Sequence, residues 1–258
     1  MSSCAAKMPP ASSLPPLEPN TRRRIAIIGM PNTGKSTFFN RLTGASARIG
    51  NWPGVTVDLL AARLIVGDSV VELVDLPGLY DMRGFSEDEA VVRNFLCSQQ
   101  VDVVAIVINT VQIERQLHLA CQVRALGLPA VLVLNMQDEA EQLGIRIETE
   151  KLSQLLNMPV VSVSAKLGQG MNQIVPTFQR VLHTQQSVAV SQENFEQLPS
   201  DEVIHSETNA LFHATVDIPV LASKQLASRL DKWLLHPVLG LPLFFLILFA
   251  LFQAVYIL

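Results

Sequence analysis

The stretch Gly29-Met30-Pro31-Asn32-Thr33-Gly34-Lys35-Ser36 decides the fold of this chain, because it matches the pattern GxxxxGK[ST]. It follows the apolar run IAIIG at 25–29 and opens the amphipathic stretch STFFNRL at 36–42. In a strand, glycine-rich turn and helix of this order, backbone N–H groups at the helix N-terminus bind nucleotide phosphates. A glycine-rich turn that binds nothing is the alternative, and the flanking strand and helix disfavour it.

The residue types in this loop suit phosphate and magnesium. We expect the Lys35 ammonium group to bind the β- and γ-phosphates and the Ser36 hydroxyl to bind Mg²⁺. Together with a glycine further along the chain, the residues predicted to bind phosphate are Gly29, Asn32, Thr33, Gly34, Lys35, Ser36, Thr37 and Gly78.

Outward from this loop, short apolar runs alternate with amphipathic stretches. Runs rich in β-branched residues, typical of strands buried on both faces, lie at 25–29, 101–109, 130–135 and 159–164. Helical patterns lie at 36–42, 87–96, 113–127, 149–157 and 170–182. The alternation predicts an α/β fold of the P-loop NTPase type, with a mostly parallel sheet flanked by helices. One antiparallel pair is expected between 59–66 and 70–75, because Gly67-Asp68-Ser69 between them suits a hairpin.

Two further motifs are candidates for reading a base. Asn135-Met136-Gln137-Asp138 follows a predicted strand, at the edge where open α/β sheets bind ligands. The Asp138 carboxylate accepts hydrogen bonds from guanine N1–H and the exocyclic amine, whereas adenine would leave it unpaired at a cost of about 1–3 kcal/mol. Asn135 is expected to tie this loop to the phosphate loop, and the backbone of Ser164-Ala165-Lys166 to bind guanine O6. Each motif alone also fits a cap or turn, but their order predicts a GTP-binding, Ras-like G domain.

The strand at 70–75 ends in Asp75-Leu76-Pro77-Gly78. There the carboxylate can hold Mg²⁺ through a water and the Gly78 N–H can contact a γ-phosphate, although a simple turn is the alternative. Thr56, between the first helix and the second strand, is placed to supply a second hydroxyl. The predicted magnesium ligands are therefore Ser36, Thr56 and Asp75, and the predicted catalytic residues are Lys35, Thr56 and Gly78.

Longer stretches carry a more specific signal. GNWPGVTV at 50–57, VDLPGLY at 74–80, SEDE at 86–89, LNMQD at 134–138 and GIRI at 144–147 resemble the N-terminal G domain of FeoB-type ferrous iron transport proteins, which fall in the TrmE-Era-Era-like GTPase class. Residues 230–240 and 252–255 resemble the entry of that family into its first membrane helix. The resemblance is strong over about residues 23–180 and good over 226–258.

The resemblance implies further site residues. Asn32 matches an asparagine that helps to hold a monovalent cation, K⁺, against the phosphates, and backbone carbonyls near Gly50 and Trp52 would complete that site. A side-chain cap on the loop is the alternative role of Asn32. Leu79 stands where Ras-like proteins have a water-orienting glutamine, so the resemblance implies slow intrinsic GTP hydrolysis.

Composition and the resemblance together divide the chain into four expected parts. Residues 1–22, broken by prolines, form a disordered tail, and 23–183 form the FeoB-type G domain. Residues 184–229 form a short linker or reduced helical domain with one helix over 202–214. Residues 184–222 look poorly helical for the domain that modulates nucleotide release in the family.

Residues 230–258 are expected to begin the first transmembrane helix. No charged residue occurs in 238–258, a run long enough to cross a hydrocarbon core of ~30 Å, and a buried core helix is the alternative. Arg229 and Lys232 precede this run, so residues 1–232 are expected to be cytoplasmic, at a bacterial inner (plasma) membrane.

The expected function is the nucleotide switch of a ferrous iron (Fe²⁺) transporter, with Mg²⁺ and K⁺ as cofactors. The expected partners are GTP or GDP, the membrane, and the remaining transporter membrane domain or other Feo-type subunits. Nucleic acid is not expected, because the formal net charge is -4 and no basic domain is present. The sequence holds no bundle of membrane helices, so the chain is expected to lack a pore and to be a fragment, a truncated product or a G subunit.

Two other functions compete with this interpretation. A soluble or membrane-anchored Era-like GTPase in ribosome or RNA maturation shares the phosphate-loop style, but such a protein would carry a basic RNA-binding appendage. An ATP-dependent P-loop enzyme is disfavoured by Asp138.

Overall fold

The computed structural model describes residues 23–44, 47–50, 52, 57–84, 86–184 and 188–218, together with 241, 242, 245, 248, 249, 252 and 253. The chain divides into two compact units, Met1–Asp217 and Ile218–Leu258. The tail at 1–22 lies outside the described residues, as does most of the transmembrane helix expected at 230–258. Among the residues that are described, no helix is both long and apolar enough to cross a membrane.

A seven-stranded sheet, in the order β2-β3-β4-β1-β5-β6-β8, forms the centre of the first unit. Its strands are β1 (Arg23–Ile28), β2 (Arg48–Gly50), β3 (Leu59–Val66), β4 (Ser69–Asp75), β5 (Val103–Asn109), β6 (Ala130–Asn135) and β8 (Val160–Ser162). The run from β4 through β1, β5 and β6 to β8 is parallel, while β3 pairs antiparallel with β2 and β4. Both the mostly parallel sheet and the antiparallel pair are confirmed.

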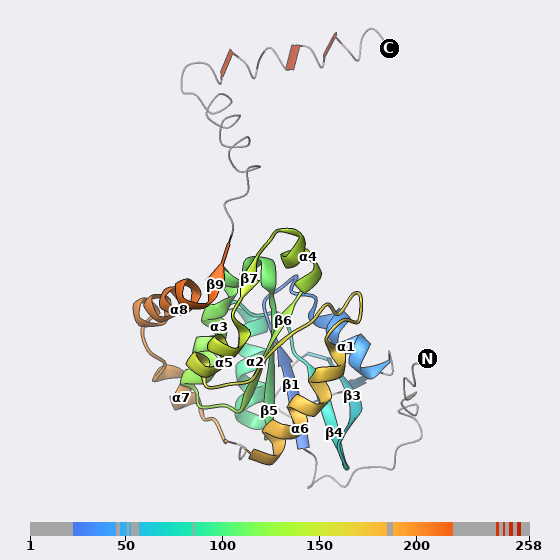
Figure 1. Ribbon diagram of the computed structural model, residues 1–258. Helices are drawn as coiled ribbons and strands as arrows, with labels where there is room; N and C mark the ends of the chain where they lie inside the picture. Colours follow the sequence, from blue (N-terminus) through green and yellow to red (C-terminus); the bar gives the residue numbers. More distant parts are fainter. Residues whose placement is uncertain are drawn as a thin grey trace, which may run out of the picture. The chain divides into compact units, whose positions relative to one another are not determined.

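Helices cover both faces of this sheet (Figure 1). One face is covered by α1 (Lys35–Thr43) and α6 (Ile174–Thr184). The other face is covered by α2 (Glu87–Ser98), α3 (Ile113–Ala125) and α5 (Thr149–Leu156). Shorter helices are α4 (Gln137–Gln142), α7 (Gln192–Glu196), and two 3₁₀ turns at Thr110–Gln112 and Met171–Gln173.

Strand alternation divides the buried side chains between two cores. In β1, Ile25 and Ile27 face α1 and α6, whereas Ala26 and Ile28 face α2 and α3. Because residues 25–28 are buried on both faces of the sheet, this part of the strand is apolar, which explains the continuous run that precedes the glycine-rich loop.

The described part of residues 184–222 is more helical than the sequence suggested. Helix α8 (Asp201–Thr215) is 15 residues long and packs on α3, and β9 (Val216–Asp217) pairs with β7 (Arg146–Ile147). The predicted helix at 202–214 is confirmed, but the expectation of a poorly helical segment is wrong. Its buried face includes the polar residues Thr208 and Thr215, which hide the apolar periodicity.

Candidate nucleotide-binding site

The loop between β1 and α1 depends on two glycines. Gly34 has φ of 78°, and a Cβ atom there would lie 2.5 Å from the Asn135 amide nitrogen. A Cβ atom on Gly29 would lie 2.2 Å from the Val107 carbonyl oxygen. The first turn of α1 holds no acidic residue and no side-chain cap, so its N–H groups at the carboxyl edge of the parallel strands are available to an anion.

A cavity of about 450 Å³ lies in front of this helix N-terminus. Six of the predicted phosphate ligands line it, namely Asn32, Gly34, Lys35, Ser36, Thr37 and Gly78. The other lining residues are Met30, Pro31 and Asp88. Two other predicted ligands support the loop instead. The Thr33 side chain is buried and its hydroxyl donates to the Met30 carbonyl at 3.0 Å, while the Gly29 carbonyl accepts the Leu79 N–H at 3.2 Å.

Lys35 and Asp75 form an ion pair at this site. The Lys35 ammonium group lies 2.9 Å from an Asp75 carboxylate oxygen and 2.6 Å from the Leu76 carbonyl oxygen. Burial raises the pKa of Asp75, although the Lys35 charge and hydrogen bonds from Lys35 and Ser36 act in the opposite direction. A hydroxyl and a carboxylate side by side are hard oxygen donors that fit Mg²⁺. Thr56, the third predicted ligand, lies outside the described residues.

A second cavity, of about 140 Å³, adjoins the first. It is lined by Gly34, Thr37, Asn135, Met136, Asp138, Glu139, Ser164 and Lys166. Gly34 and Thr37 line both cavities, so the predicted phosphate and base sites lie next to each other.

Asn135 joins the two sites through its amide group. The amide nitrogen donates to the Thr33 carbonyl at 2.9 Å, and the amide oxygen accepts the Ala165 N–H at 3.0 Å. Both bonds are buried, and the Asn135 carbonyl oxygen accepts a third from Thr110. The structure therefore brings all five predicted guanine-binding residues together, and Asn135 contacts the phosphate loop as expected.

The described residues of the expected K⁺ site do not line one common cavity, unlike most residues of the predicted guanine site. Neither described cavity that Asn32 lines includes Gly50 or Trp52. Gly50 ends β2, and the Trp52 ring packs against Phe95 at 5.3 Å between ring centroids and lies under Arg24.

The loop after β4 is held by residues that the sequence did not single out as site residues. One Glu89 carboxylate oxygen accepts the N–H groups of Tyr80 and Asp81, and the other accepts the Ser86 N–H. These bonds outweigh burial, which would raise the pKa of Glu89, and they hold it below its ordinary range. Ser86 and Glu89 form a capping box at the start of α2, and the spacing Ser-x-x-Glu is the sequence pattern that could have marked Glu89.

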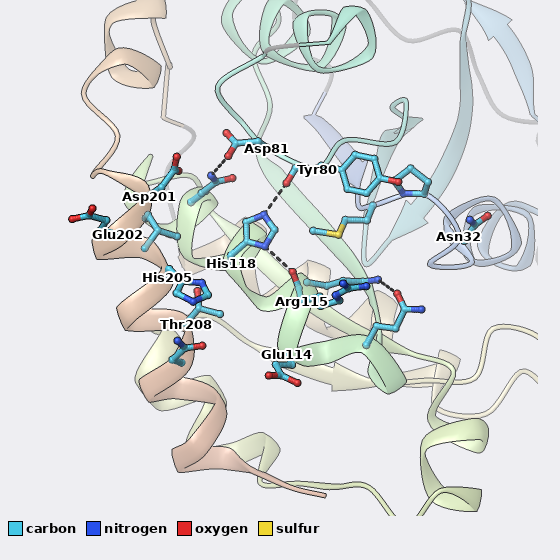
Figure 2. Close-up of a pocket in the computed structure, with 17 residues that line it drawn as sticks. Asn32, Tyr80, Asp81, Glu114, Arg115, His118, Asp201, Glu202, His205 and Thr208 are labelled. Carbon is cyan, nitrogen blue, oxygen red and sulfur yellow. Dashed lines mark hydrogen bonds between the residues drawn. The ribbon is translucent and has the colours of Figure 1, made fainter. Parts of the chain in front are cut away.

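A larger cleft, of about 1010 Å³, lies between this loop, α3 and α8 (Figure 2). A ring nitrogen of His118 lies 2.8 Å from the Tyr80 carbonyl oxygen, and the buried Gln122 amide contacts both Asp81 and the Met82 N–H. Arg83 bonds to Asp201 at the start of α8. The loop after β4 is thus connected to α3 and α8.

Comparison with known proteins identifies the family. The model of the family described as "Ferrous iron transport protein B" matches residues 23–178. The chain is 40% identical over 238 residues to the Fe(2+) transporter FeoB of Synechocystis sp., which covers 92% of this chain and 39% of that protein. The chain therefore spans well under half the length of this relative.

Solved structures agree with this match. The cytosolic domain of L. pneumophila FeoB superposes with a TM-score of 0.66 at 25% identity, covering 75% of this chain and 99% of that one. A GDP-bound mutant of the S. thermophilus FeoB G-domain gives a TM-score of 0.59 at 29% identity, covering 74% and 88%. With its P-loop GTPase fold and a match over more than half its length, the chain belongs to the ferrous iron transport protein B family.

Proposed function

We propose that this chain binds and hydrolyses GTP, and that it is the nucleotide switch of a ferrous iron transporter. One observation carries the proposal: the pocket that contains Asp138 shares Gly34 and Thr37 with the phosphate cavity. A base and a phosphate chain attached to one ribose need such adjoining sites. The GDP-bound state of the S. thermophilus relative supports the same ligand class.

The pocket chemistry favours guanine. Asp138 accepts from N1–H and the 2-amino group, while the backbone of Ser164-Ala165-Lys166 faces O6. The Met136 side chain and the Lys166 stem supply apolar contact for the faces of the base. An adenine nucleotide would leave the Asp138 carboxylate without a donor.

Hydrolysis rests on Lys35, Thr56 and Gly78. On nucleotide binding, Lys35 exchanges the Asp75 carboxylate for phosphate oxygens, and its charge stabilises the negative charge of the transition state. Ser36, Asp75 and Thr56 would hold Mg²⁺, which neutralises phosphate charge when bound. Gly78 lines the cavity, where its N–H would contact the γ-phosphate.

Intrinsic turnover is slow in this proposal. Leu79, directly after Gly78, is only 1% exposed, and its N–H is bonded to the Gly29 carbonyl. This buried apolar side chain cannot orient a water, so backbone groups near Thr56 and Gly78 must do so. K⁺ held by Asn32 and the carbonyls of Gly50 and Trp52 would supply additional positive charge.

The switch acts through the segments 45–58 and 77–88. The second of these is bonded to α3 through His118 and Gln122 and to α8 through Arg83. A change at Gly78 therefore reaches α8. From residues 184–229 the change passes to a membrane domain that begins near 230–258. That domain lies in the inner (plasma) membrane, and residues 1–232 are cytoplasmic. Further Feo-type subunits are proposed partners.

Mg²⁺-dependent phosphate release from GTP and ATP tests the enzymatic part, with Lys35→Ala and Thr56→Ala as inactive variants. GTP-selective turnover is expected, and equal turnover of ATP would refute the proposal. Fe²⁺ uptake by vesicles containing a transporter that includes this domain tests the transport part. Identical Fe²⁺ uptake by the wild type and Lys35→Ala would show that transport does not depend on the GTPase. Stimulation of GTP hydrolysis by ribosomal RNA would favour the Era-like alternative.

A further inference from the structure

Arg41, in the last turn of α1, contacts the loop that follows β8. Its Nε donates to the Ala165 carbonyl oxygen at 3.0 Å and its Nη2 donates to the Lys166 carbonyl oxygen at 2.6 Å. A Cβ atom on Gly168 would lie 3.5 Å from the guanidinium carbon, so the group packs closely against Gly168 of this loop. Within the described residues Arg41 takes part in no ion pair, which leaves these two carbonyls as its polar partners.

Holding a carbonyl also fixes the direction of the next N–H. A trans peptide is planar, so its C=O and N–H point to opposite sides, and the described chain contains no cis peptide. With the Ala165 carbonyl held by Arg41, the Lys166 N–H must point away from the guanidinium. Likewise, the Leu167 N–H points away from the held Lys166 carbonyl and donates to the Ser164 hydroxyl at 3.3 Å.

Arg41 stands one helical turn after Thr37, which lines both the phosphate cavity and the base pocket. The loop is therefore held from two sides. Asn135 fixes the Ala165 N–H, and Arg41 fixes the two carbonyls that follow. The fork of a guanidinium suits two neighbouring acceptors, which a lysine cannot bridge in the same way.

We propose that Arg41 is a positioning residue for guanine recognition, and that it acts by orienting the peptide group between Ala165 and Lys166 so that the Lys166 N–H faces O6 of the base. The inference rests on the proposed function, because it supposes that the pocket takes guanine. Arg41 also links α1, whose N-terminus faces the phosphate cavity, to the loop that contacts the base. Loss of Arg41 therefore weakens base contact without changing any phosphate ligand.

The test compares three ligands with the 258-residue chain: GDP, 6-thio-GDP and IDP. The sulfur of 6-thio-GDP accepts hydrogen bonds weakly at the position of O6, whereas IDP keeps O6 and lacks the 2-amino group that Asp138 reads. Arg41→Ala is expected to raise the GDP dissociation constant about tenfold and to speed GDP release by a similar factor. The wild-type preference for GDP over 6-thio-GDP should shrink toward one, and the preference for GDP over IDP should stay unchanged.

Two further variants sharpen the result. Arg41→Lys keeps the charge but not the fork, so its GDP affinity should fall between those of Arg41→Ala and the wild type, and it replaces Arg41→Ala if that variant fails to fold. Arg180→Ala on α6 removes another exposed helical arginine and should match the wild type with all three ligands.

The inference is overturned if the Arg41 variants keep the wild-type preference for GDP over 6-thio-GDP, even where all affinities fall together. That outcome would give Arg41 a general structural role. Failure of the proposed function has a different signature, because wild-type protein would then bind ADP as tightly as GDP.

Discussion

The ammonium group of Lys35, which lines the phosphate cavity, lies 2.9 Å from a carboxylate oxygen of Asp75. This pair holds together a proposed phosphate ligand and a proposed magnesium ligand. Asp75→Asn should therefore lower Mg²⁺-dependent GTP hydrolysis about tenfold or more, because Mg²⁺ loses a carboxylate. In EDTA the same variant should bind GDP at least as tightly as the wild type, since Lys35 no longer has a competing partner. Phosphate release from GTP with Mg²⁺ measures the first result, and fluorescent GDP titrations in EDTA measure the second. Weaker GDP binding by the variant in EDTA would refute the exchange of partners.

Glu89 gives the loop after β4 a dependence on pH. Its pKa is lowered from 4.5, so its contribution to stability is complete above that value and is lost as the pH falls through the lowered pKa. Glu89→Gln should lower the free energy of unfolding at pH 7 by about 1–3 kcal/mol, because backbone N–H groups lose a charged acceptor.

Urea unfolding of Glu89→Gln and the wild type at a series of pH values measures this difference. The two stabilities should converge as the pH falls below the ordinary Glu range. A difference that stays constant with pH would show that the charge of Glu89 does not hold the loop.

Arg83 connects the loop after β4 with α8. Asp201 is mostly exposed, so Arg83→Met should change the free energy of unfolding by no more than about 1 kcal/mol. The coupling between the bound nucleotide and α8 is measured separately from stability. Hydrogen exchange in α8 should differ between GDP and a non-hydrolysable GTP analogue in the wild type, and this difference should shrink in Arg83→Met. An unchanged difference would mean that the signal reaches α8 through α3 alone.

The sequence predicted the central parts of this fold because they are long and periodic. Residues 25–28 of β1, 103–108 of β5 and 130–134 of β6 are continuous apolar runs, and the carboxyl ends of these strands place the predicted motifs at one edge. β2, β7 and β9 are two or three residues long, too short for any period to show. They exist because of long-range pairing, and a local pattern cannot predict that.

The same reason limits the prediction of the site. Asn135 and Asp138 follow a strand in a recognisable motif, so their place could be inferred. Arg41 contacts a loop more than 120 residues away, and nothing near it in the sequence marks that contact. Thr56 and most of the expected membrane helix lie outside the described residues, so they remain predictions.

Asn32 tests the expected K⁺ site. It is exposed and has φ of 63°, so Asn32→Gly removes the side chain without backbone strain, and Asn32→Ala adds that strain. Wild-type GTP turnover should be faster in KCl than in NaCl, and both variants should lose the difference. If both variants keep it and only their unfolding temperatures fall, Asn32 is a cap of the loop.

The most direct test of the central claim is the nucleotide preference of Asp138→Asn, measured as kcat/KM for GTP and xanthosine triphosphate. An asparagine amide donates to the xanthine 2-carbonyl and no longer satisfies guanine. GTP efficiency should fall at least about tenfold, while efficiency with xanthosine triphosphate should rise. Equal losses for both nucleotides would contradict a guanine-reading role for Asp138, and with it the account of this site.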